Sequence, residues 1–171
     1  MHIYSYCIPE SDTYYTRIPI YNKDKNVISM LMKNRHRFLT QLFHLLLRTG
    51  MPYCYNAFSI DGNPKFKIDC IFTGVRYTLL NGNTLEKLPI MQKRVQLIEK
   101  MQYFIIEGNI YEFENDHTYS GILKLNGEKV AYISNLDNTT TNLTYRIRIE
   151  ANNDNIASLI AILYQTFIHE K

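Results

Sequence analysis

Residues 155–171 read NIASLIAILYQTFIHEK, and they are apolar on every side when arranged as an α-helix. The apolar members are Ile156, Ala157, Leu159, Ile160, Ala161, Ile162, Leu163, Tyr164, Phe167 and Ile168. A helix on a protein surface keeps one polar face, so a helix that is apolar all round must be enclosed. We expect Asn153 or Asp154 to cap its N-terminus. At 1.5 Å per residue it spans about 22 Å, less than the ~30 Å core of a bilayer, which disfavours a membrane anchor.

The residues before this helix are organised as short strands separated by turn signals rich in Asn and Gly. Residues 143–150 alternate strictly between apolar and polar side chains, the pattern of a half-buried strand. The predicted strands are 14–21, 27–32, 53–60, 66–72, 76–80, 85–91, 95–98, 102–106, 110–114, 119–125, 129–133 and 143–150. We therefore predict a mainly β domain over residues 1–171, a closed antiparallel barrel of about twelve strands around the hydrophobic C-terminal helix.

Composition narrows the class of protein without naming an activity. The chain has fourteen Tyr, eight Phe and no Trp, and its formal net charge is +3. Aromatic side chains favour sheet, and so small a charge does not by itself indicate nucleic acid or membrane. The three cysteines Cys7, Cys54 and Cys70 have no framework spacing, and residues 1–4 lack the features of a signal peptide. We expect a cytoplasmic protein in which Cys54 and Cys70 are buried thiols.

One segment combines basic residues with an apolar helical face, and it is the strongest candidate for a binding site. Leucines and phenylalanines recur at helical spacing over residues 35–49, and Gly50 and Pro52 then end the segment. The candidate lipid- or partner-binding residues are Lys33, Arg35, Arg37, Phe38, Leu42, Phe43 and Arg48. Such a segment can lie at a membrane interface or dock on a partner protein. It can also simply cap one open end of the barrel.

The order of these features resembles the tubby C-terminal-like superfamily, which includes the LURP-one-related proteins and the phospholipid scramblases. The matching features are the strand pair 18–21 and 27–30, the hairpin 58–68, the strand 77–80, residues 108–113 and 127–131, and the helix 159–169. The resemblance covers residues 12–170 and is closest to small single-domain members from low-GC Gram-positive bacteria. It implies a twelve-stranded barrel traversed by a hydrophobic C-terminal helix. The helix at 35–49 departs from the family pattern, and no binding residue is carried over.

Other residue patterns do not indicate catalysis. The five histidines lack metal-ligand spacing, and no nucleophile–base pair or phosphate-binding motif is present, so we expect no catalytic residues, metal or cofactor. A second basic cluster, Lys87, Lys93, Arg94 and Lys100, is interleaved with Glu86 and Glu99 and is typical of a solvated strand face. Nucleic-acid binding would need a larger positive surplus.

These observations lead to one expected function and one alternative. The expected function is a non-enzymatic cytoplasmic binding or tethering module that associates with anionic phospholipid head groups at the inner membrane face. The alternative is a protein–protein interaction or regulatory module that uses the 35–49 helix as its docking surface.

Overall fold

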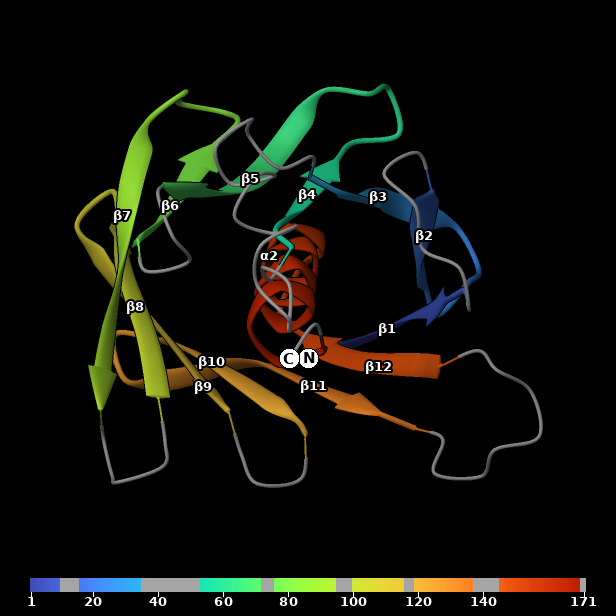
Figure 1. Cartoon of the computed structure of the whole chain (residues 1–171). Coiled ribbons are helices and arrows are strands. Elements are labelled where there is room, and N and C mark those ends of the chain that lie inside the picture. The colour runs from blue at the N-terminus through green and yellow to red at the C-terminus, as the bar shows by residue number, and fades with distance from the viewer. Residues whose placement is uncertain are drawn as a thin grey trace, which may run out of the picture.

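The computed structural model describes residues 1–9, 16–34, 53–71, 76–94, 100–115, 119–136 and 145–169. Its strands form a closed antiparallel barrel in which each strand pairs with its neighbours in sequence and β1 pairs with β12 (Figure 1). The strands are β1 His2–Ile8, β2 Arg17–Asn22, β3 Val27–Lys33, β4 Tyr55–Phe58, β5 Pro64–Ile71, β6 Arg76–Asn81, β7 Lys87–Arg94, β8 Lys100–Ile106, β9 Asn109–Asn115, β10 Gly121–Leu125, β11 Glu128–Asn135 and β12 Tyr145–Ala151. The predicted fold class is confirmed.

The strand that closes the barrel was absent from the predicted set. In β1, Tyr4, Tyr6 and Ile8 point inward in strict alternation, and seven residue pairs join it to β12, from His2 opposite Ala151 to Ile8 opposite Tyr145. The alternation of Tyr4, Tyr6 and Ile8 is the same period-two signal that predicts the other strands. The predicted strand 95–98 and the predicted helix 35–49 lie outside the described residues.

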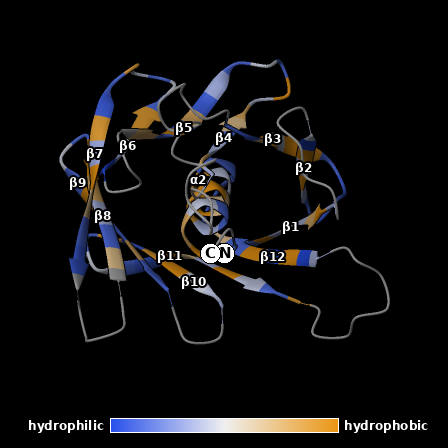
Figure 2. Ribbon diagram, viewed as in Figure 1, coloured by the Kyte–Doolittle hydropathy of each residue, from blue (hydrophilic) through white to orange (hydrophobic). Residues whose placement is uncertain are grey.

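The C-terminal helix lies inside the ring of strands, as predicted (Figure 1). Helix α2 spans Asp154–Tyr164 and continues as one π-helical stretch, η1, over Gln165–His169. Every residue from 156 to 168 is buried, and Leu159, Leu163 and Phe167 are 1%, 0% and 3% exposed. Along the strands, hydrophobic and hydrophilic residues share each element (Figure 2), because one side chain faces the helix and the next faces outward.

Three polar side chains on this enclosed helix form hydrogen bonds with the surrounding barrel, although the buried Gln165 Oε1 has no hydrogen-bond partner among the described residues. The Ser158 hydroxyl lies 2.8 Å from the Ser29 hydroxyl on β3, and the backbone N–H of Tyr55 on β4 donates to the Thr166 hydroxyl at 3.2 Å. The Gln165 side-chain amide donates to the Tyr6 hydroxyl on β1 at 2.8 Å. A buried polar group without a partner costs about 1–3 kcal/mol, so these contacts fix the rotation of the helix inside the barrel.

Asn153 begins the helix, as one of the two predicted caps. Its backbone is extended, and its side-chain Oδ1 accepts the N–H of Ile156 at 2.9 Å. Replacing Asn153 with Ala removes this acceptor, so we expect the free energy of unfolding to fall by about 1 kcal/mol. Chemical denaturation measures the change. Asn153→Ser, which restores an acceptor, should recover most of it, and an equal loss in both variants would contradict the capping role.

Candidate binding surface at the C-terminal end of the helix

The two ends of the barrel are built differently, because the strand direction alternates. The end beside the start of α2 carries the short turns at residues 23–26, 59–63, 82–86, 107–108 and 126–127. The connections at residues 9–16, 34–54, 72–75, 95–99, 116–120 and 136–144 all join strands at the other end, where η1 ends, and they include the three longest, 9–16, 34–54 and 136–144. We call this second end the η1 rim. It consists of the two terminal residues of each strand at that end, for example Met32 and Lys33 of β3.

Lys33 is the one predicted site residue among those the structure describes. It ends β3 at the η1 rim, opposite Tyr55 of β4, and its Nζ lies 4.1 Å from the centre of the Tyr53 ring. A lysine ammonium over a tyrosine face is attracted by the electrostatic field of the ring. The remaining six predicted residues, Arg35, Arg37, Phe38, Leu42, Phe43 and Arg48, lie outside the described residues.

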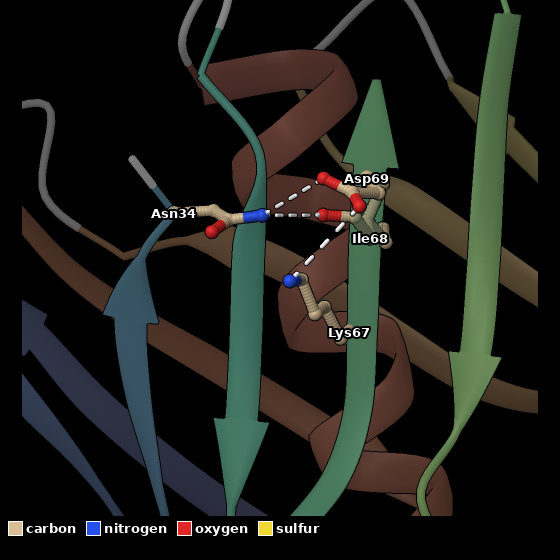
Figure 3. A network of polar contacts seen from close by, with 4 residues as sticks. All are labelled: Asn34, Lys67, Ile68 and Asp69. Atoms are coloured by element: carbon tan, nitrogen blue, oxygen red, sulfur yellow. Dashed lines mark hydrogen bonds and ion pairs between the residues drawn. The ribbon is translucent and has the colours of Figure 1, made fainter. Parts of the chain in front are cut away.

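The residues that flank the 35–52 segment are held together by hydrogen bonds. The backbone N–H of Asn34 donates to the carbonyl of Cys54 at 2.7 Å. The Asn34 side-chain amide passes β4 and donates to the carbonyl of Ile68 at 3.2 Å and to Asp69 Oδ1 at 3.3 Å, and Lys67 Nζ lies 4.0 Å from Asp69 Oδ2 (Figure 3). The segment therefore leaves and re-enters the barrel at one place on the η1 rim, beside Lys33.

The structure brings Arg17, Arg76 and Arg146, which belong to neither predicted basic cluster, to the same rim as Lys33 and three members of the second cluster. Within the η1 rim, the basic residues are Arg17, Lys33, Arg76, Lys93, Arg94, Lys100 and Arg146, and the one acidic residue is Glu114. Glu114 is paired with Lys124 at 2.7 Å. Arg17, Arg76, Lys93 and Arg146 are exposed, and none of them forms an ion pair with another described residue. They are scattered along the sequence, so no sequence motif could have grouped them.

The two ends consequently differ in charge. Among the described residues, the η1 rim holds seven basic residues and one acidic residue, a surplus of six positive charges. By sequence alone, the segments that connect these strands and residues 170–171 contain four basic and six acidic residues. At the opposite end, the strand ends and turns, with Asp154, hold six basic and seven acidic residues, a surplus of one negative charge. The predicted cluster of Lys87, Lys93, Arg94 and Lys100 is divided between the ends, since Lys87 starts β7 at the far end.

A cavity of about 730 Å³ lies at the opposite end, beside the start of α2. Its lining includes the charged side chains of Lys23, Lys65, Asp24 and Asp154, together with Met1 and His2. The Tyr4 hydroxyl donates to Asp154 Oδ1 at 2.8 Å, and burial together with this carboxylate raises the pKa of Tyr4. Partial burial lowers the pKa of Lys65, against the opposing effect of Asp154, and its Nζ donates to the carbonyl of Ile28 at 3.2 Å.

The cysteines differ in exposure, because Cys7 is exposed and the other two lie in the core. Cys54 and Cys70 are buried, as predicted, and burial raises the pKa of the Cys54 thiol, which suppresses the reactive thiolate. Among the described side chains, no three His, Cys, Asp or Glu residues gather where they could hold a metal ion. The described helical residues also contain no stretch with the length and hydropathy of a bilayer-spanning helix.

The described strands form a closed barrel around a central helix, and the described residues of its η1 rim are mostly basic where they are charged. The chain belongs to the Tubby C-terminal-like domain family, whose model matches residues 4–170. The match begins within β1, the strand that the sequence analysis missed. No curated protein and no solved structure matches the chain. Tubby-like domains in general bind lipids or proteins and are generally not enzymes, so the chain is classed as a binding module.

Proposed function

We propose that this domain is a cytoplasmic, non-enzymatic module that binds anionic phospholipid head groups at the inner face of the membrane through its η1 rim. The observation that supports the proposal is the set of exposed cations on this rim, Arg17, Arg76, Lys93 and Arg146, which form no ion pair among the described residues. A cation close to an anionic membrane surface contributes about 1 kcal/mol to binding.

The predicted basic segment is connected to the same rim, because its flanking residues Asn34 and Cys54 are hydrogen-bonded to each other beside Lys33. In this proposal Lys33, Arg35, Arg37 and Arg48 add to the attraction. Phe38, Leu42 and Phe43 then bury apolar surface in the head-group layer. In this proposal the cations of the rim and the apolar side chains of the segment bind the same face of the bilayer.

Neutralising three rim cations should weaken binding to anionic vesicles by on the order of 100-fold, at about 1 kcal/mol for each charge. The variant is Arg17→Gln with Arg76→Gln and Arg146→Gln. It is compared with the wild type by co-sedimentation with phosphatidylcholine vesicles, with and without phosphatidylserine, over a series of salt concentrations. We expect wild-type binding to require phosphatidylserine and to fall as salt rises, because ions screen exposed charges.

A matched control carries Lys23→Gln, Lys25→Gln and Lys87→Gln, three exposed lysines at the opposite end. Both triple variants lower the formal net charge from +3 to zero, so an effect of total charge would weaken them equally. The proposal requires the control to bind as the wild type does. Equal binding of the wild type to both vesicle types would remove the lipid function and leave a protein partner for the segment 35–49.

A further inference from the structure

Three exposed apolar side chains lie at the η1 rim or directly next to it, on or beside neighbouring strands. Tyr119 precedes β10, Leu136 follows β11 and Tyr145 begins β12, and these strands pair with one another along the lower side of the barrel in Figure 1. Their exposed fractions are 73%, 49% and 49%. We call these three residues, two tyrosines and one leucine, the aromatic patch.

Short contacts tie the aromatic patch to the end of the central helix. The Tyr164 hydroxyl donates to the carbonyl of Tyr119 at 3.1 Å, and the ring of Tyr145 packs edge-on against His169 with centroids 5.4 Å apart. The backbone N–H of Leu136 donates to the carbonyl of Arg146 at 2.9 Å. The patch is therefore a fixed surface around η1, with the exposed cation Arg146 directly beside it.

The stability of the fold does not account for the position of Tyr119. Its φ is +56°, a conformation that costs a residue with a Cβ about 1 kcal/mol or more. A side chain that is 73% exposed gains little from burial to offset this cost. Its backbone carbonyl could accept the Tyr164 hydrogen bond with any side chain at 119. Leu85 at the opposite end combines the same strain with nearly the same exposure, so the charge of the surrounding end distinguishes the two positions.

We propose that the aromatic patch enters the interfacial layer of the same bilayer that the rim cations face, an inference that rests on the proposed function. Tyrosine is suited to this depth, because its ring is apolar and its hydroxyl reaches the wet head-group region. The surplus of positive charge at this end favours an anionic lipid surface as the occupant. Leu85 and Ile60 at the opposite end are 71% and 65% exposed, but that end has no positive surplus.

The chain contains no tryptophan, so a single introduced Trp reports on one place. The probes are Tyr119→Trp and Tyr145→Trp. Leu85→Trp is the matched control, because Leu85 has a φ of +57° and nearly the exposure of Tyr119. Each is mixed with vesicles of phosphatidylcholine and phosphatidylserine, with and without chain-brominated lipid. We expect the emission of both patch probes to shift to shorter wavelength and to be quenched by bromine, while Leu85→Trp stays unchanged.

A second measurement tests the energetic contribution of the patch. Tyr119→Ser combined with Tyr145→Ser should weaken vesicle partitioning roughly 10-fold or more, while Ile60→Ser combined with Leu85→Ser should leave it unchanged. Thermal unfolding verifies that each variant is folded.

If the protein binds anionic vesicles and the patch probes neither shift nor are quenched, this inference fails and the proposed function stands. If no variant and no wild-type protein binds such vesicles, both fail. A shift of Leu85→Trp alone would reverse the orientation and overturn the inference.

Discussion

Deletion of residues 156–168 should abolish cooperative unfolding, although all twelve strands remain in the truncated chain. The deleted segment contains seven large apolar side chains that are at least 91% buried: Ile156, Leu159, Ile160, Ile162, Leu163, Phe167 and Ile168. At about 1.5–3 kcal/mol each, their burial contributes roughly 10–20 kcal/mol as an upper bound. A typical domain is stable by only about 5–15 kcal/mol, so the barrel cannot lose this helix and remain folded.

Differential scanning calorimetry and near-ultraviolet circular dichroism measure the result. Two point variants calibrate it within the intact chain. Leu163→Ala should lower the free energy of unfolding by about 2–5 kcal/mol, because Leu163 is fully buried. Asn155→Ala, at an exposed position on the same helix, should change it by less than about 0.5 kcal/mol. A sharp, cooperative transition in the truncated chain would show that the barrel has a core of its own.

Among glycine-to-alanine substitutions in the described turns, Gly82→Ala should cause the largest loss in the free energy of unfolding. A Cβ at Gly82 would lie 1.7 Å from the carbonyl oxygen of Pro64 and 2.5 Å from its carbon. These are backbone atoms, so the turn after β6 must move away from β5 and stretch the hydrogen bond from Gly82 N–H to the carbonyl of Lys65, now 2.8 Å. Overpacking and the lost bond together predict a loss of about 3–4 kcal/mol in the free energy of unfolding.

Gly62→Ala separates this clash from the cost of backbone conformation. Gly62 has a φ of +84°, and no atom lies within 4 Å of the place that a Cβ would take. Ala at this position therefore has only the left-handed penalty of about 1–2 kcal/mol. Urea titration of both variants gives the comparison. A loss for Gly82→Ala no larger than that for Gly62→Ala would mean that the two segments separate without consequence.

The candidate site was only partly accessible from the sequence. Lys33 was predicted because it adjoins a run of basic and apolar residues at helical spacing, a signal contained in one short stretch. Arg17, Arg76 and Arg146 lie far apart in the chain, and each looks like an ordinary polar residue of a predicted strand. They share a rim because β2, β6 and β12 start at the same end of the barrel, which requires the direction of every strand to be known. The aromatic patch likewise draws on residues that precede, follow or begin three different strands.

The enclosed helix, the antiparallel strands and the barrel could be derived from residues 1–171 read in order, because hydrophobic periodicity is a local property. A segment that is apolar all round must be covered, and segments of period two must pair, whichever residues cover or pair with them. Closure through β1, the charge difference between the two ends and the gathering of Tyr119, Leu136 and Tyr145 around η1 depend on contacts between distant residues. Those contacts exist only once the strands have been ordered and the helix has been threaded among them, so no local pattern could encode them.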